Sequence, residues 1–176
     1  MPAWNIFECP PERLLELFAL RARVWIAAGA DPGAFPGGRW CDERDAGRRH
    51  WIALVDGVIV AGASLGVHTS LADVEEAAAY AGIGWPGTGP VAAPARVVVT
   101  AGWRGSGIVT GLLDRQDEAA RAAGAVLAIR QASPMLRPLL ERRGWCCHGP
   151  GPADSRFPGI RFEVMSWQLW PGTCRS

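Results

Sequence analysis

The sequence predicts an α/β protein built around one mixed β-sheet with flanking helices. Residues 96–100 form a β-branched run of the kind found in a strand covered on both faces. Apolar side chains recur at helical spacing over 12–28 and 106–123, and a glycine stands at or just beyond the end of each helix. Asp56 and Gly57 separate two strand-like runs and predict a tight hairpin.

The remaining elements follow from the same patterns. In chain order we expect a strand at 4–8, a helix at 12–28, a hairpin of strands at 50–55 and 58–65, a short helix at 71–81, a strand at 96–100, a helix at 106–123, a strand at 126–130, a helix at 134–143 and two closing strands, the second at 161–169. A loop at 30–48, rich in glycine, proline and charge, is either a mobile lid or a poorly ordered connection. The length of 176 residues predicts a single domain over 1–176.

Composition excludes several classes of function. The net charge of +1 argues against nucleic acid or an anionic membrane as the main partner. All the basic residues are arginines, so lysine Schiff-base chemistry is excluded. No apolar run approaches the length of a bilayer span, and no secretion signal is apparent, so we expect a cytoplasmic protein. Its five cysteines then read as reduced thiols, and the adjacent Cys146 and Cys147 lack the spacing of a metal site, so no metal is expected.

The most informative segment is the turn that joins the strand at 97–99 to the following helix. Gly105 and Gly107 allow the backbone to approach a ligand closely, and Arg104 adds a positive charge. The amino terminus of the helix supplies unpaired amides and the positive end of a dipole, a combination that suits a phosphate. Neither a Walker loop nor a dinucleotide fingerprint is present. An ordinary glycine-containing turn remains the alternative.

With its flanking elements, this segment resembles motif A of the GNAT superfamily of N-acetyltransferases, whose pattern is Gln/Arg-x-x-Gly-x-Gly/Ala. The pattern is met at Arg104 and Gly107, whereas Val109 stands where glycine or alanine is usual. That substitution crowds the place where a pyrophosphate would approach the backbone. The first helix, the hairpin and the Gly144-Trp145 pair follow in the order of the family, so the resemblance covers about 12–148.

The resemblance implies a splayed sheet and acetyl-CoA, or another acyl-CoA, as co-substrate without a metal. The main chain of Val97, Val98 and Val99 would pair with the pantetheine arm. The pyrophosphate would be wrapped by Arg104, Gly105, Ser106, Gly107, Ile108, Val109 and Thr110. The amine of a small molecule would attack the thioester directly, without an acyl-enzyme. A homodimer is compatible with this reading.

The proposed reaction also requires residues that accept and donate protons. An alkyl amine with a pKa of about 10.4 must lose a proton before attack. His68 is the first candidate for the base, with Asp42 and Asp45 behind it, although a structural histidine and a solvated acidic loop are the alternatives. Many GNAT relatives carry a tyrosine as general acid, and by spacing that position is Leu140 here. Ser133 or water would then protonate the leaving thiolate.

The front of the chain supports a second reading. Arg21, Trp25 and Trp40, followed by Asp42 and Asp45, resemble the pattern of acyl-homoserine-lactone synthases and long-chain N-acyl amino acid synthases. We therefore expect Arg21, Trp25 and Trp40 on the substrate side. The alternatives are an Arg21 side chain that reaches solvent and tryptophans that fill the core or a dimer interface. The Arg-Gly-x-Gly turn favours CoA over the carrier-protein donors that such relatives often use. A third reading is a non-catalytic acyl-CoA-binding module, which Val109 and Leu140 favour.

Overall fold

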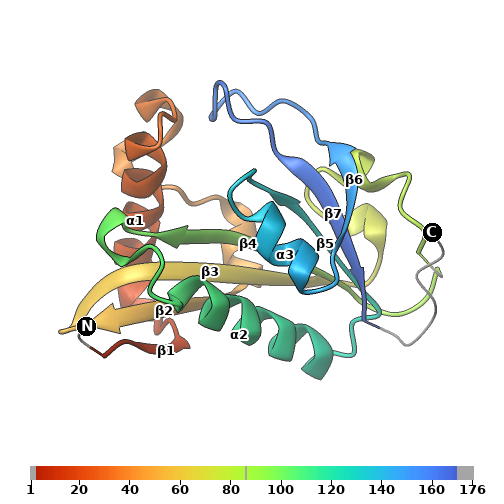
Figure 1. The fold of residues 1–176 in the computed structure, drawn as a ribbon, viewed down its shortest axis with the longest axis horizontal. Helices are drawn as coiled ribbons and strands as arrows, with labels where there is room; N and C mark the ends of the chain where they lie inside the picture. Colours follow the sequence, from red (N-terminus) through yellow and green to blue (C-terminus); the bar gives the residue numbers. More distant parts are fainter. Residues whose placement is uncertain (1–2, 86, 170–176) are drawn as a thin grey trace. The chain divides into compact units, whose positions relative to one another are not determined.

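The computed structural model describes residues 3–85 and 87–169. Its strands form one sheet in the order β1-β2-β3-β4-β5-β7-β6 (Figure 1). β4 and β5 are parallel, whereas β1 with β2, β2 with β3, β5 with β7 and β6 with β7 are antiparallel. The predicted fold class, a mixed sheet flanked by helices, is confirmed.

The bounds of the elements are as follows. The strands are β1 Asn5–Glu8, β2 Arg49–Val55, β3 Val58–His68, β4 Val91–Val99, β5 Leu127–Ala132, β6 Cys146–Pro150 and β7 Glu163–Gln168. The α-helices are α1 Leu14–Ala27, α2 Ile108–Ala122 and α3 Arg137–Arg142. Short 3₁₀ turns are η1 Pro11–Arg13, η2 Pro32–Ala34, η3 Pro36–Gly38, η4 Glu43–Gly47, η5 Leu71–Asp73, η6 Ala77–Tyr80 and η7 Ala101–Trp103.

Two expectations about these elements are wrong. The helix expected at 71–81 is replaced by two 3₁₀ turns, because Glu76 adopts a left-handed backbone conformation (φ 57°) that a right-handed helix cannot accommodate. The strand expected to begin at Arg96 begins at Val91 and continues through Pro94. Proline removes a backbone donor and is normally confined to edge strands, first strand positions or bulges, so no local pattern predicted a strand that continues through Pro94.

The chain folds into two compact units. The first unit comprises the residues up to Leu65, Arg96–Asp117 and Ser155–Pro158, and the second comprises Gly66–Ala95, Glu118–Asp154 and the residues from Gly159 on. The boundaries fall inside β3, β4 and α2, so these three elements run from one unit into the other without a linker. The single-domain organisation stays a prediction.

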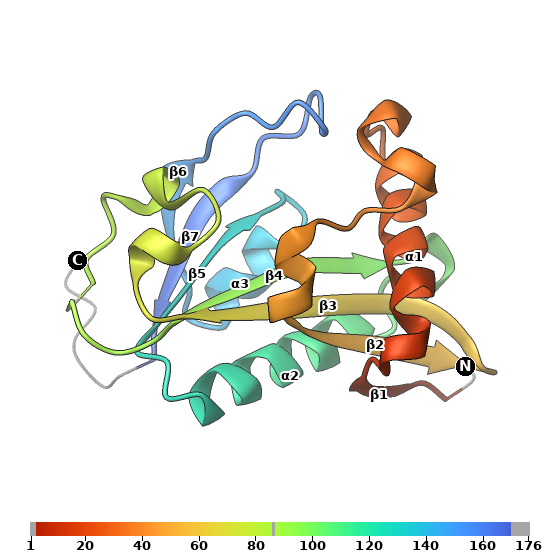
Figure 2. The ribbon, with the colours of Figure 1, turned by 180° about the vertical axis from the view of Figure 1, so that it is seen from behind.

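In the first unit, α1 and the beginning of α2 lie on opposite faces of β2 and β3 (Figures 1 and 2). Leu17 of α1 lies so close to β3 that a Cβ atom on Gly62 would come within 2.4 Å of its Cδ1. On α2, Gln116 donates a hydrogen bond from Nε2 to the carbonyl of Ser64 at 2.6 Å. The two contacts hold both helices against one strand.

The second unit has a separate apolar core, formed around β5 and the first residues of β4. β4 pairs with β5 where Val91 faces Leu127 and Ala92 faces Ala128. The core comprises Val74, Tyr80, Ile83, Val91, Ala93, Leu127, Ile129 and Val164. The chain's one tyrosine is therefore a core residue of this unit, and burial raises its pKa to about 12.

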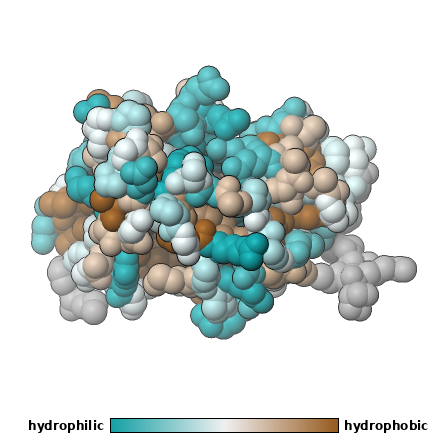
Figure 3. Space-filling model, turned by 90° about the horizontal axis from the view of Figure 1, so that it is seen from above, coloured by the Kyte–Doolittle hydropathy of each residue, from teal (hydrophilic) through white to brown (hydrophobic). Residues whose placement is uncertain are grey.

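The surface mixes polar and apolar side chains. Figure 3 shows hydrophilic residues interspersed with hydrophobic ones over the face that it presents. Large exposed hydrophobic side chains include Phe7, Leu15, Val58, Val67 and Met135. Among the described residues, no helix has both the length and the apolar character needed to cross a membrane.

Candidate functional site

The turn before α2 has the backbone geometry that close approach to a ligand requires. Gly105 and Gly107 have φ angles of 76° and 87°, a region that side chains with a Cβ rarely adopt. A Cβ atom built on Gly105 would meet no atom within 4 Å, and one on Gly107 would meet only Trp4, at 3.8 Å. Glycine is therefore required at both positions by the backbone conformation and not by lack of space, and the space beside Gly105 is open.

Contacts with Trp4, which directly precedes β1, and with η7 hold this turn in position. The hydroxyl of Ser106 donates to the carbonyl of Trp103 at 2.6 Å, and the indole nitrogen of Trp4 donates to the carbonyl of Ser106 at 3.3 Å. One turn into α2, a Cβ atom on Gly111 would lie 2.8 Å from Cδ1 of Ile6. A glycine at 111 thus lets the start of α2 lie directly against β1.

The turn presents positive electrostatic groups to its surroundings. Arg104, Gly105 and Gly107 are exposed, and α2 begins at Ile108. The first amides of an α-helix have no intrahelical acceptor, and the helix dipole places a partial positive charge there. Exposed amides, a positive dipole end and the Arg104 guanidinium together suit an anionic group. Val109, the departure from the family pattern, is only half-buried.

β4, the strand that precedes this turn, has an irregular backbone. Arg96 has a φ angle of 56°, a left-handed conformation in the middle of the strand. Val97 and Val99 are half-buried and Val98 is buried, so the segment expected to pair with pantetheine alternates in exposure. The amide of Thr100 donates to the carbonyl of Val60 at 2.9 Å, which joins the end of β4 to β3.

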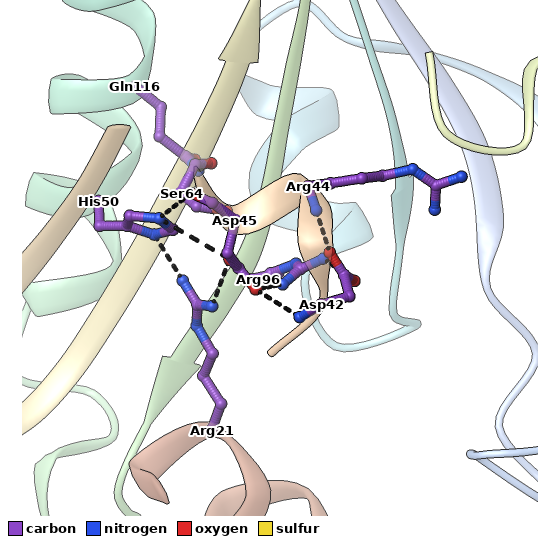
Figure 4. Close-up of polar contacts among 8 residues, drawn as sticks. All are labelled: Arg21, Asp42, Arg44, Asp45, His50, Ser64, Arg96 and Gln116. Atoms are coloured by element: carbon purple, nitrogen blue, oxygen red, sulfur yellow. Dashed lines mark hydrogen bonds and ion pairs between the residues drawn. The ribbon is translucent and has the colours of Figure 1, made fainter. Parts of the chain in front are cut away.

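A buried charge network surrounds Arg96 (Figure 4). Nη1 of Arg96 contacts Oδ2 of Asp45, and its Nη2 donates to Oδ2 of Asp42 at 2.5 Å. Arg21, which is fully buried, donates from Nη1 to Oδ1 of Asp45 at 2.9 Å and from Nη2 to Nδ1 of His50 at 2.9 Å. Two guanidiniums and two carboxylates thus balance one another inside the first unit.

The protonation states in this network follow from its donors. Burial alone would raise the pKa of Asp45, but the neighbouring charges of Arg21 and Arg96 outweigh it, and the pKa is lowered. Burial, aided by the charge of Arg21, lowers the pKa of His50. Because a guanidinium only donates, Nδ1 of His50 must accept, and its Nε2 donates to the carbonyl of Asp45 at 2.9 Å. His50 is therefore a neutral structural group at pH 7.

An aromatic cluster adjoins the network. Phe157 lies 4.7 Å from Trp25 and 5.4 Å from Trp40, measured between ring centroids, and the buried Phe35 completes the cluster. The guanidinium of Arg96 lies 5.4 Å from the centroid of Trp40, close enough for a cation–π contact. The loop at 30–48 is thus folded into 3₁₀ turns and packed, which contradicts a poorly ordered connection, whereas a role as a mobile lid stays a prediction.

The structure gathers part of the expected site. Arg21, Trp25, Trp40 and Asp42 come together in the first unit, and this unit also holds 97–99 and 104–110. Their roles as catalytic or substrate residues stay predictions. Both terminal nitrogens of Arg21 already contact Asp45 and His50, a position that favours orienting other groups over touching a substrate.

The other proton-transfer candidates belong to the second unit. His68 is half-buried at the end of β3, directly before Thr69 and Ser70, whose hydroxyls donate to Oδ2 of Asp73 at 2.9 Å and lower its pKa. The carbonyl of Ser133 accepts hydrogen bonds from two amides at the start of α3. Leu140 is buried in α3, so its position offers neither a proton nor access to solvent.

Sequence reasoning missed Arg96 and Phe157. Arg96 stands directly before three valines in a strand expected to be covered on both faces, and a charge there requires a buried partner. That requirement could have indicated an acidic partner such as Asp45. Phe157 lies in a polar, proline- and glycine-containing stretch and shows no periodicity, so its packing against Trp25 had no signature in the sequence.

The cysteines and histidines of the described part of the chain make no metal cluster. No group of three or more His, Cys, Asp or Glu side chains able to hold a metal occurs there. Cys147 donates to Glu163 at 2.8 Å, and Nε2 of His148 is 2.7 Å from the hydroxyl of Ser166. Of the described cysteines, Cys9, Cys41, Cys146 and Cys147 form no disulfide, and Cys174 lies outside the described residues.

Comparison with known families now gives the relationship. Residues 14–145 match the acetyltransferase (GNAT) family. The chain belongs to this family. The match spans the turn at Arg104, the buried network and α3, and it confirms the resemblance drawn from the sequence. The chain matches no curated protein.

Solved structures of this GNAT chain's neighbours share the fold at low identity. An acetyltransferase of the GNAT family from Staphylococcus aureus Mu50 is 16% identical, with a TM-score of 0.67 over 96% of this chain and 100% of that one. The acyl-homoserine-lactone synthase LasI is 13% identical, with a TM-score of 0.69 over 96% and 91%. FeeM, an N-acyl amino acid synthase from uncultured soil microbes, is 11% identical, with a TM-score of 0.66 over 96% and 92%.

Proposed function

We propose that this chain is an acyl-CoA-dependent N-acyltransferase that transfers acetyl from acetyl-CoA to the amine of a small molecule. The observation that carries the proposal is the exposed turn at Arg104–Gly107, whose two positive-φ glycines lead into the amino terminus of α2. This geometry suits the pyrophosphate of CoA. Membership of the GNAT family supports the reaction class.

In the proposed reaction a base first takes a proton from the ammonium group of the substrate, and we assign that base to His68. The neutral amine then attacks the carbonyl carbon of the thioester, and a C–N bond forms. The tetrahedral intermediate collapses, the C–S bond breaks, and the second amine proton is released to water. Asp42 is less suited, because one of its oxygens accepts from the amide of Arg44 at 3.0 Å and the other from Arg96.

The leaving group needs little assistance. Leu140 is buried and supplies no proton. A thiol like that of cysteine has a pKa of about 8.5, which is about 1.5 units above neutral pH and corresponds to roughly 2 kcal/mol. CoA can therefore leave as the thiolate or take a proton from water or Ser133, and catalysis rests on positioning.

A longer acyl donor is the second candidate. Arg21, Trp25, Trp40 and Asp42, whose pattern resembles that of acyl-homoserine-lactone and N-acyl amino acid synthases, lie together in the first unit. Solved structures named as such synthases, LasI and FeeM, share the fold. This candidate predicts that a long-chain acyl donor binds more tightly than acetyl-CoA.

Titration by calorimetry separates these functions. Acetyl-CoA, CoA and a long-chain acyl-CoA are each added to the full chain, and thioester loss is then followed across a panel of amines. Tightest binding and turnover of acetyl-CoA support the proposal, and preference for the long chain supports the second candidate. Tight binding without thioester loss indicates a binding module, and the absence of any binding contradicts all three.

The turn itself is tested by a matched pair of glycine variants. Gly105→Val places a side chain in the open space of the turn, whereas Gly124→Val makes the same change beyond the end of α2. The φ angles are 76° and 70°, and neither added Cβ atom meets another within 4 Å, so both variants carry similar backbone strain. We expect Gly105→Val to raise the Kd for CoA by about tenfold or more, a loss of about 1.4 kcal/mol. An equal Kd for both variants would place the pyrophosphate elsewhere.

A further inference from the structure

Arg96 combines two features that are each uncommon. Its backbone is left-handed at φ 56° within β4, a conformation that is unfavourable for a residue with a Cβ. Its guanidinium is almost fully buried, which is unfavourable for a charge without partners. Strained backbone persists where the surroundings over-determine it, and such positions cluster at functional sites.

The surroundings of Arg96 restrain its side chain from several elements. Asp42 and Asp45, at either side of the start of η4, receive its two terminal nitrogens, and the ring of Trp40 lies 5.4 Å from its guanidinium carbon. Asp45 is itself held by Arg21 of α1 (Figure 4). The guanidinium is therefore fixed in both position and orientation.

The restrained residue lies next to the segment expected to hold the acyl donor. Arg96 directly precedes Val97–Val99, the segment whose main chain is expected to pair with the pantetheine arm, and β4 continues into the turn at Arg104. Holding the side chain of Arg96 therefore holds the backbone that aims this segment. Through Arg96, the contacts of Asp42, Asp45 and Arg21 act on this same stretch of backbone.

We propose that Arg96, fixed by Asp42 and Asp45, is a positioning residue that sets the backbone of β4 for the acyl donor. The inference rests on the proposed function, because it assumes that the acyl donor lies along Val97–Val99. Under this proposal Arg21 and Asp42 act by holding Arg96, and they do not contact the reacting atoms.

Two substitutions at residue 96 separate the backbone effect from ordinary stabilisation. Arg96→Ala and Arg96→Gly both remove the guanidinium, but only glycine adopts positive φ without strain. Glycine is otherwise the poorer residue in a strand. We expect Arg96→Gly to keep the Kd for CoA within about threefold of the wild type, and Arg96→Ala to raise it about tenfold or more, as the loss of a preset backbone geometry implies.

Asp56 supplies the matched control. It has a φ angle of 48° in the exposed turn between β2 and β3, outside the network and the proposed site. Asp56→Ala and Asp56→Gly should differ in melting temperature and share the wild-type Kd for CoA. Equal Kd values for the two Arg96 variants, whether both normal or both raised, would overturn the positioning role.

A milder variant keeps the inference testable if Arg96→Ala does not fold. The side chain of Asp42 is 30% exposed, so Asp42→Asn weakens the grip on Arg96 without leaving a fully buried charge unpaired. A positioning role predicts a Kd for CoA raised about threefold or more. A role as general base leaves that Kd unchanged and would overturn the inference.

The positioning role and the proposed function fail in different ways. If the wild-type chain does not bind CoA, the proposed function is overturned, and the positioning role with it. If the wild-type chain binds CoA and the variants bind it equally well, only the positioning role is overturned.

Discussion

Arg21, Asp45 and His50 come from α1, η4 and β2, and each satisfies polar atoms on the others. A buried guanidinium or carboxylate is costly unless its hydrogen-bonding capacity is met, so the three residues are interdependent. The tautomer of His50 is part of that arrangement, because its two ring nitrogens have opposite roles. Protonation of Nδ1 would place a positive charge against Arg21.

Stability should therefore fall when His50 is forced to take up a proton. Its folded pKa is lowered from the ordinary value of 6.5, so below that pH the unfolded chain binds the proton more readily. We expect the free energy of unfolding to decrease as the pH falls from about 6.5 through the folded pKa, and His50→Gln to flatten that part of the curve. Urea unfolding at a series of pH values measures the slope.

A second histidine serves as the control for this experiment. His148 lies in β6 next to the hydroxyl of Ser166, outside the buried network. His148→Gln is taken through the same urea series as the matched substitution outside the network. A wild-type slope in the His50 variant would show that the decrease arises elsewhere.

At the scale of elements, the contact between α2 and β1 depends on small residues. A Cβ atom at position 111 would lie 2.8 Å from Cδ1 of Ile6 and 3.3 Å from the ring of Trp4. Alanine is otherwise favoured over glycine in a helix by about 1 kcal/mol. Crowding against β1 and intrinsic propensity thus oppose each other at Gly111.

A double-mutant cycle measures this opposition. Ile6→Val removes the crowded Cδ1 atom, so we expect Gly111→Ala to be more favourable in the Ile6→Val background than in the wild type by about 1 kcal/mol. Free energies of unfolding for the four chains give the coupling. Additive effects would show that α2 does not lie against Ile6 in solution.

Local patterns predicted most of the elements and none of the long-range contacts. The helices near 14–27 and 108–122 and the hairpin around Gly57 have periodicity and turn residues of their own. Glu76 has no feature that predicts its left-handed backbone, so the helix expected at 71–81 was wrong. The ion pair between Arg96 and Asp45 joins residues 51 positions apart, and no local spacing encodes it.

For the candidate site, the turn at Arg104–Gly107 could be predicted because its chemistry lies in consecutive residues. Gly105 and Gly107 both adopt the positive φ angles that such a turn requires. Arg21 and Asp42 were selected by resemblance, but their relation to Arg96 depends on how β4 passes η4 in the fold. The sequence therefore indicated candidate residues more readily than it indicated what those residues contact.

At the scale of the whole molecule, β3, β4 and α2 each run through both compact units. Elements shared in this way leave neither unit with a complete set of strands and helices. We therefore expect one cooperative unfolding transition, in accordance with the single domain expected from the chain length. Asp45→Asn, which leaves Arg21 and Arg96 with an uncharged partner, should lower the free energy of unfolding by about 3–5 kcal/mol.

Hydrogen exchange measured by mass spectrometry tests whether both compact units lose this stability. Peptides from β2 report on the first unit and peptides from β5 on the second. If unfolding is cooperative, Asp45→Asn lowers the opening free energy of both sets by the same amount, although the substituted residue belongs only to the first unit. If β5 keeps its wild-type protection while β2 loses it, the units unfold separately and the chain is not a single cooperative domain.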